Sequence, residues 1–82
     1  MEPRAQVRRL SGKQLLCTAR NRAVITDRTV EDGGTDIGFT SGELLLMAIG
    51  SCATGSVRNY LQEHGTTCGH LRTEVFFEPA AQ

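Results

Sequence analysis

Residues 38–52 read GFTSGELLLMAIGSC and predict the start of a buried helix. Thr40 is a good N-cap, and Glu43 stands three residues later, where its carboxylate reaches back to the backbone N–H of the cap. This capping-box pattern comes directly before an apolar run. We therefore expect the helix to begin at Ser41.

The apolar run of this helix covers its whole circumference. Residues 44–49 are six consecutive apolar residues, which at about 100° per residue leave no polar side. From Cys52 onward the apolar residues narrow to one face, with Ala53, Val57, Tyr60 and Leu61. Gly65 supplies the left-handed residue that commonly ends a helix. A helix that is apolar on every side has to be covered on every side.

The length of the chain limits what can cover the helix. At 82 residues the sequence makes at most one domain, and a domain this small buries only roughly 60–65% of the surface that its unfolded chain exposes. The few short strands outside the helix can cover one of its faces. We therefore expect a homo-oligomer in which the helix packs against its symmetry mate.

Charge and cysteine content exclude several classes of protein. Nine basic and nine acidic residues cancel, so the net charge suggests neither a nucleic acid nor a membrane surface as partner. No apolar stretch reaches the length of about 18 residues that a membrane span needs, and residues 1–4 lack the order of a signal peptide, which favours a cytoplasmic protein. Three cysteines without a CxxC pair predict no disulfide framework and no metal site, and nothing predicts a cofactor.

Outside the helix, the sequence predicts an antiparallel meander. Its three strands are expected at residues 5–10, 14–19 and 23–26. A turn is predicted at residues 11–13, and a tight hairpin turn at Arg20-Asn21, where Asn tolerates positive φ.

Two further segments complete the expected α+β fold. Residues 28–38 are rich in Gly and Asp and predict a flexible loop that leads to the helix cap. Residues 70–77 alternate and predict a fourth strand with Leu71, Thr73, Val75 and Phe77 on one face.

Cys52 is the residue around which any chemistry would be centred. It lies about three turns into the helix, beyond the reach of the N-terminal dipole, so a reactive thiolate would need an arginine from elsewhere in the fold. Arg20 and Arg22 flank the tight turn and are the candidates. The alternative is that Cys52 is only a small residue in a close helix crossing, since free cysteines are among the most buried residue types.

The stretch 38–52 resembles the segment of OsmC/Ohr-like proteins that leads into their central helix, where the pattern is close to G-P-[ST]-P-x-E-L-L-L-A-A-[IL]-G-S-C. Phe39 and Ser41 stand in place of the two prolines. Upstream, residues 20–27 and the pair Gly33-Gly34 look like the arginine-bearing turn, strand and double glycine of that family. The resemblance covers roughly residues 5–78. It implies a single α+β domain over residues 1–82, forming an intertwined homodimer with the long helix at its centre.

The resemblance also implies a function. The family includes thiol peroxidases that reduce organic hydroperoxides, in which the cysteine matching Cys52 attacks the peroxide and a second cysteine on a later helix resolves the sulfenic acid. Arg20 or Arg22 matches the arginine that stabilises the thiolate. In the hydroperoxide-reductase branch the carboxylate that holds this arginine lies where this chain has Gly42, whereas Glu43 matches the broader OsmC-like branch.

The sequence matches the N-terminal half of the longer family proteins, and neither Cys17 nor Cys68 matches the resolving position. The expected function is therefore reduction of a small hydroperoxide through Cys52 with an external thiol as reductant. The alternative is a catalytically inactive dimeric module that binds small apolar ligands.

Overall fold

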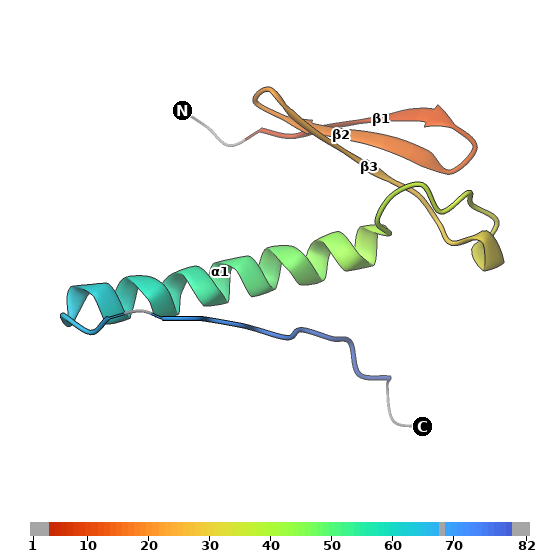
Figure 1. Ribbon diagram of the computed structural model, residues 1–82. Coiled ribbons are helices and arrows are strands. Elements are labelled where there is room, and N and C mark those ends of the chain that lie inside the picture. The colour runs from red at the N-terminus through yellow and green to blue at the C-terminus, as the bar shows by residue number, and fades with distance from the viewer. Residues whose placement is uncertain (1–3, 68, 80–82) are drawn as a thin grey trace. The chain divides into compact units, whose positions relative to one another are not determined.

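The computed structural model describes residues 4–67 and 69–79 of the chain. It divides into two compact units, Met1–Leu44 and Leu45–Gln82 (Figure 1). Helix α1 (Ser41–Glu63) begins in the first unit and continues in the second. The sequence favours a loop or strand-edge position for Cys68, and this residue lies outside the described residues.

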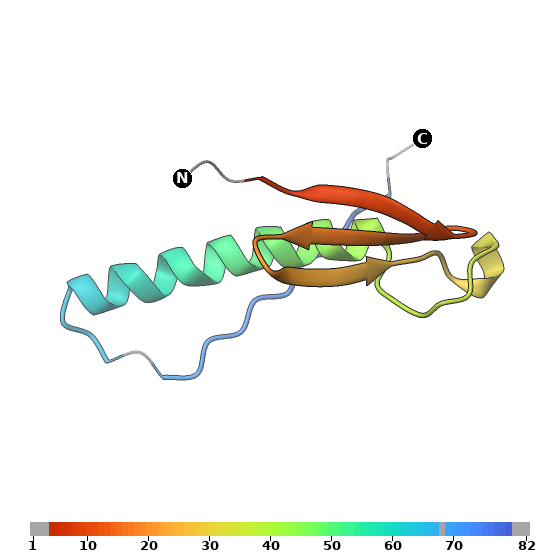
Figure 2. The ribbon, with the colours of Figure 1, turned by 90° about the horizontal axis from the view of Figure 1, so that it is seen from above.

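The first unit is built on the predicted antiparallel meander. Strands β1 (Gln6–Ser11), β2 (Gln14–Ala19) and β3 (Arg22–Thr26) form one sheet in the order β1-β2-β3 (Figure 2). The register pairs Leu16 with Ile25, and Cys17 with both Val7 and Val24. The predicted bounds of β2 are confirmed, those of β1 differ by one residue at both ends, and those of β3 differ by one residue at its start.

The two hairpin turns fall where the sequence predicts them, but the positive φ of the second turn is on a different residue. Gly12 has φ 55° in the first turn, and Arg20 has φ 55° in the second. The expectation that Asn21 takes the positive φ is wrong. A positive φ at the first of two central residues alone is the pattern of a type II′ turn, which suits the twist of the flanking strands.

The loop from β3 to α1 is organised by the carboxylate of Asp27. Its Oδ1 accepts the N–H of Arg28 at 2.7 Å, and its Oδ2 accepts the N–H of Thr35 at 3.1 Å and that of Ile37 at 3.3 Å. The Thr35 hydroxyl donates to the same Oδ2 at 2.5 Å. We call these four bonds the Asp27 network. The loop also contains a short 3₁₀ helix, Val30–Asp32, so it has more structure than the flexible loop that its composition predicts.

Beyond this network the chain returns to the sheet before the helix begins. The N–H of Asp27 donates to the carbonyl of Phe39 at 2.9 Å, and Thr26 forms a parallel bridge with Phe39. Gly38 lies so close to β3 that a Cβ there would come within 2.2 Å of the Ile25 carbonyl oxygen. The absence of a side chain at residue 38 is therefore what allows this approach.

Helix α1 begins and ends as predicted. The N–H of Thr40 donates to Glu43 Oε1 at 2.9 Å and the N–H of Glu43 donates to Thr40 Oγ1 at 3.1 Å, which confirms the capping box. At the other end Gly65 has φ 69°. The N–H groups of Gly65 and Thr66 donate to the carbonyls of Gln62 and Leu61, respectively, which is the Schellman arrangement.

The apolar side chains of the single chain remain largely accessible. Among the described residues only Thr26 and Asp27 are buried, with 3% and 2% of their surface exposed, and no apolar residue is. Helix α1 has no buried residue, and Leu45 and Ile49 are 53% and 49% exposed. The predicted burial of this helix is thus not achieved within one chain, because the described residues hold no element that encloses it.

Residues 69–79 run back along α1 in the second unit without forming a strand (Figure 1). The hydroxyls of Thr54 and Thr73 lie 2.5 Å apart, and a Cβ at Gly50 would come within 3.1 Å of Val75 Cγ2. The expected fourth strand is therefore absent from this part of the described chain. Alternation favours an extended backbone, but a strand also needs a neighbouring backbone to pair with.

Candidate functional site

Cys52 lies on the uncovered side of helix α1. Gly50 and Thr54, which meet the returning segment, are each two residues from Cys52 and therefore about 200° around the helix from it. On the thiol's own side the neighbours one and two turns before are Ile49 and Leu45, both exposed. Cys52 is exposed, and its thiol makes no hydrogen bond within residues 45–67 and 69–79. A small molecule can therefore reach the sulfur in the single chain.

The basic residues of the second unit are engaged elsewhere. Arg58 Nη2 donates to Asn59 Oδ1 at 3.3 Å, and Arg72 Nη2 forms an ion pair with Glu74 Oε1 at 2.5 Å. Both side chains of the ion pair are highly exposed, and such pairs contribute little to stability. Neither of these interactions involves the Cys52 thiol.

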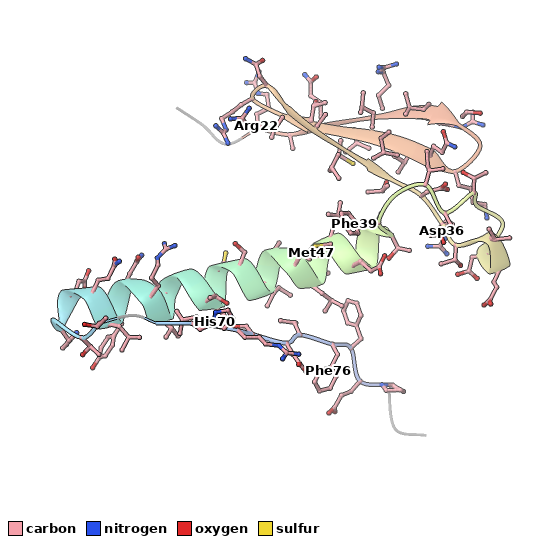
Figure 3. All side chains as sticks on the ribbon, viewed as in Figure 1. Arg22, Asp36, Phe39, Met47, His70 and Phe76 are labelled. Carbon is pink, nitrogen blue, oxygen red and sulfur yellow. The ribbon has the colours of Figure 1, made fainter. Side chains whose placement is uncertain are left out.

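Arg20 and Arg22 lie in the first unit at the tip of the β2–β3 hairpin, where Figure 3 labels Arg22. Both are exposed, and neither side chain makes a hydrogen bond or ion pair to the described residues. Their guanidinium groups are thus free to meet an anion. Their pairing with Cys52, which belongs to the second unit, stays a prediction.

Glu43 has a structural role at the start of α1. Its carboxylate accepts the N–H of Thr40, which completes the capping box and fixes the direction in which the helix leaves the loop. The structure thus gives Glu43 a partner other than an arginine.

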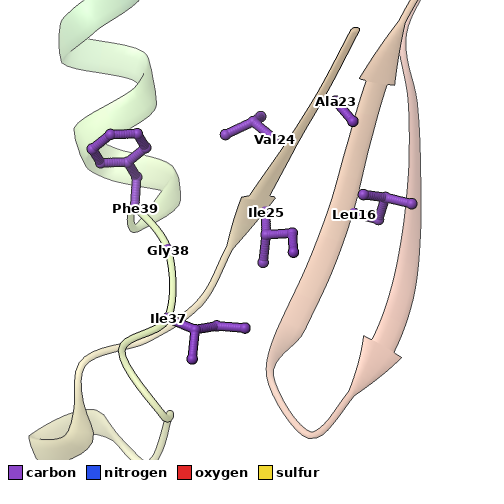
Figure 4. Close-up of a pocket in the computed structure, with 7 residues that line it drawn as sticks. All are labelled: Leu16, Ala23, Val24, Ile25, Ile37, Gly38 and Phe39. Atoms are coloured by element: carbon purple, nitrogen blue, oxygen red, sulfur yellow. The ribbon is translucent and has the colours of Figure 1, made fainter. Parts of the chain in front are cut away.

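An apolar hollow of about 390 Å³ lies in the first unit between the sheet and the chain that leads to α1 (Figure 4). The strands contribute four apolar residues, and residues 37–39 form the facing wall. The lining residues are Leu16, Ala23, Val24, Ile25, Ile37, Gly38 and Phe39. Such a surface suits an apolar group of a ligand rather than a charged one.

Asp27 is a residue that the sequence reasoning did not single out. Its network lowers the pKa of the carboxyl group from 3.8 to about 2, with the Thr35 hydroxyl having the largest effect and burial acting in the opposite direction. The backbone N–H groups of Arg28, Ile37 and Thr35 add to the lowering. An Asp directly after a strand and before a Gly-rich loop is the signal that could have found it, because Asp commonly bonds to nearby N–H groups.

Residues 4–67 and 69–79 contain neither a metal-binding cluster nor a membrane-spanning helix. No cluster of three or more His, Cys, Asp or Glu side chains is placed to hold a metal ion there. None of the described helices combines the length and apolar character needed to cross a membrane.

The meander and the long helix with an exposed thiol define an α+β protein with an accessible cysteine on its helix. A family model described as OsmC-like protein matches residues 33–82. This range is more than half of the 82 residues and includes Cys52, so the chain belongs to the OsmC-like protein family. Comparisons with curated proteins and with solved structures gave no match.

Proposed function

We propose that this protein is a thiol-dependent redox protein that reduces organic hydroperoxides through Cys52. The observation that carries the proposal is the exposure of Cys52 on the uncovered side of α1, within the part of the chain that matches the family. A peroxidatic thiol has to be reached by its substrate, whereas a cysteine that only packs is inert. The neighbouring Leu45 and Ile49 provide an apolar approach for the organic group of the peroxide.

The proposed reaction has two stages. The Cys52 thiolate attacks one peroxide oxygen, so that an S–O bond forms, the O–O bond breaks, and the alcohol leaves with a proton from solvent. The protein is then a sulfenic acid. An external thiol displaces water from it to give a mixed disulfide, and a second external thiol releases Cys52 and leaves as the disulfide. The two electrons that reduce the peroxide thus come from two external thiols.

In this proposal Arg20 or Arg22 stabilises the thiolate. An adjacent guanidinium favours the charged form of a thiol, and both side chains are free of internal partners among the described residues. Glu43 supports the site indirectly, because its capping bonds fix the start of the helix that carries Cys52. A cytoplasmic location suits a cysteine that must be returned to its reduced form.

We also propose that the active form is an intertwined homodimer. No apolar residue is buried in the described chain, and the helix face that carries Leu45 and Ile49 is exposed. A second copy of α1 that covered part of this face would shield Leu45 and Ile49 from water and leave Cys52 within reach of the peroxide at the edge of the contact. The same association could bring an arginine of one copy to the thiol of the other.

Peroxide consumption tests the proposal directly. Cumene hydroperoxide is mixed with excess dithiothreitol and the wild type, Cys52→Ser, Arg20→Ala or Arg22→Ala. The proposal expects rapid consumption that Cys52→Ser abolishes and one arginine variant lowers by about 10²-fold or more, the range typical of lost activation. Cys17→Ser is the matched thiol control, and Arg58→Ala the matched arginine control. Wild-type consumption no faster than that by free cysteine contradicts the proposal.

The apolar hollow favours a second candidate function, a binding module for small apolar ligands. An apolar fluorescent probe such as anilinonaphthalene sulfonate should then bind the wild type, and Ala23→Phe should displace it by filling the hollow. Ala19→Phe, at the exposed end of β2, is the matched control. Probe binding with an inert Cys52 favours the module over the peroxidase. Equal binding by Ala23→Phe and the wild type argues against it.

A further inference from the structure

The strand register shows which side chains share the face of the sheet that holds the apolar hollow of the first unit. Residues paired directly across antiparallel strands point to the same face. Leu16 and Ile25, which line the hollow, pair with each other (Figure 4). Leu16 also pairs with Arg8 on β1. Arg8 therefore lies on the face of the hollow, one strand beyond Leu16.

The next row of paired residues adds two neutral polar groups to this face. Ala23, which also lines the hollow, pairs with Thr18, and Thr18 pairs in turn with Gln6. Thr18 is two residues from Leu16 and is therefore a diagonal neighbour of Arg8. Diagonal neighbours lie about 7–8 Å apart, within reach of a long side chain. The guanidinium of Arg8, the hydroxyl of Thr18 and the amide of Gln6 can thus converge on one group, and we call these three residues the polar margin.

The polar margin has hydrogen-bonding capacity that the described chain does not use. Gln6 and Arg8 are exposed, and Thr18 is half-buried. None of the three side chains makes a hydrogen bond or an ion pair with the residues that the structure describes. Because the guanidinium is charged at every physiological pH, Arg8 is a cation without a counter-ion in this part of the chain.

The single charge of the polar margin selects a singly charged head group. Among the described strand residues, Arg8 is the one that brings a charge to the face of the hollow, whereas Arg9 and Arg22 pair with Leu15 and Ala19 on the other face. A guanidinium binds a carboxylate through two parallel hydrogen bonds, so that both geometry and charge match one carboxylate. A phosphate dianion would need a second cation.

The hollow determines the rest of the ligand. Its volume of about 390 Å³ is toward the lower end of the roughly 300–1,000 Å³ that is usual for ligand pockets. Its lining residues are apolar, so they suit a short hydrocarbon chain whose polar end stays at the margin. An apolar body with one anionic end is the composition of a medium-chain carboxylate.

We propose that the hollow binds a medium-chain carboxylate, with the hydrocarbon chain against the lining residues and the carboxylate at the polar margin. Arg8 donates two charge-assisted hydrogen bonds, and the Thr18 hydroxyl and the Gln6 amide donate one each to the remaining lone pairs. This inference rests on the second candidate function, in which the hollow binds an apolar ligand, and it specifies the chemical class of that ligand. It does not involve Cys52.

The test is isothermal titration calorimetry of the full chain with octanoate below its micellar concentration, alongside octanol and acetate. Octanoate should bind more tightly than either, because octanol lacks the charge and acetate lacks the chain. Arg8→Gln should weaken octanoate binding by roughly five- to tenfold, between the effects of an exposed ion pair and a charge-assisted hydrogen bond. The same variant should leave octanol binding unchanged. Thr18→Val should weaken octanoate binding by roughly two- to threefold.

Two matched controls accompany these variants. Arg9→Gln lowers the net charge as Arg8→Gln does, but Arg9 lies on the other face of β1, so this variant should bind octanoate like the wild type. Ala23→Phe fills the hollow and should abolish binding of both octanoate and octanol, whereas Ala19→Phe should not. Circular dichroism checks that each variant folds.

Four results would overturn the proposal. Equal octanoate binding by Arg8→Gln and the wild type, with octanol still bound, would leave the hollow as a site for apolar ligands without the carboxylate. Equal weakening by Arg9→Gln would show that net charge, rather than Arg8, attracts octanoate. Absence of binding by both octanoate and octanol would contradict the second candidate function as well. Octanoate binding only with dissociation of the protein in sedimentation would mean that a second copy occupies the hollow. Peroxide consumption is not a readout here, so the thiol chemistry is judged separately.

Discussion

The carboxylate of Asp27 determines the path of the chain from β3 to α1. It is 2% exposed and accepts four hydrogen bonds from the loop that follows it. Because these bonds favour the ionised form, the folded protein holds the pKa at about 2, below its ordinary value of 3.8. A lowered pKa makes ionisation of this group a source of stability that protonation removes.

Because the pKa of Asp27 is lower in the folded protein than in the unfolded one, its contribution to stability depends on pH. The contribution of Asp27 should be complete above about pH 4 and be lost progressively as the pH falls toward about 2, since its folded pKa lies below the unfolded one. In Asp27→Asn the amide NH₂ would face N–H donors, so the variant should have a lower urea midpoint at pH 7. Its stability should also change less between pH 4 and pH 2 than that of the wild type. Urea titrations at several pH values measure both effects.

Asp36→Asn provides the matched control for this prediction. Asp36 is exposed on the same loop, and its side chain makes no hydrogen bond to the described residues. Its substitution should leave almost unchanged both the urea midpoint at pH 7 and the loss of stability between pH 4 and pH 2. An equal effect of the two substitutions would show that loop charge, rather than the Asp27 network, sets the acid sensitivity.

Two glycines should respond to alanine in opposite directions. At Gly38 the added Cβ would collide with the backbone of Ile25, so Gly38→Ala should lower the free energy of unfolding by about 1–3 kcal/mol or more. At Gly55, in the middle of α1, the nearest atom to an added Cβ is Arg58 Nη2 at 3.8 Å. Gly55→Ala should raise stability by up to about 1 kcal/mol through helix propensity. Urea denaturation of both variants measures this contrast. A Gly38→Ala variant as stable as the wild type would contradict the prediction.

At the scale of elements, the capping box makes the start of α1 dependent on two side chains. Thr40→Ala removes the oxygen that accepts the N–H of Glu43 and should cost about 1 kcal/mol. Thr40→Ser keeps a hydroxyl and should stay close to the wild type. The free energy of unfolding and the helical signal in circular dichroism measure the difference. A Thr40→Ala variant as stable as Thr40→Ser would mean that the loop alone fixes the start of the helix.

The elements that depend on nearby residues were predictable from the sequence. The capping box, the Gly65 end of α1 and strand β2 each follow from a few neighbouring side chains, and the structure has them at the predicted positions. The fourth strand was not predictable in the same way, because a strand is completed by another backbone that may be distant in sequence. The order within the loop was missed because it depends on a single carboxylate at Asp27.

The candidate site was predictable in part. The sequence pattern around Cys52 led to the OsmC-like family, which the family match confirms. Glu43 bonds to the N–H of Thr40, as the capping-box pattern predicts, and its expected place in the catalytic site stays a prediction. The sequence offers Arg20 and Arg22 equally as partners of the thiol, since both lie at the same hairpin tip and both are exposed, and their pairing with Cys52 stays a prediction.

At the scale of the whole molecule, the exposed apolar face of α1 predicts self-association. Sedimentation at micromolar concentration should give a dimer or a larger assembly for the wild type. Ile49→Glu should shift the protein toward monomer, because it places a charge where Ile49 is 49% exposed and available to a partner. Ser51→Glu, two residues from Ile49 and therefore about 200° around the helix from it, should leave the association unchanged. A monodisperse wild-type monomer would contradict the proposed dimer.

The contacts of the first unit join residues that are close together in the sequence, and this affects the order in which the chain folds. Its hairpins join neighbouring strands, and its side-chain bonds from the sheet to the loop span 19 and 21 residues at most. Closing such short loops costs little entropy and is fast. The meander can therefore assemble on the ribosome while α1 is still being synthesised, so that the helix emerges onto a scaffold whose last bond, from Asp27 to Phe39, has already set its starting point.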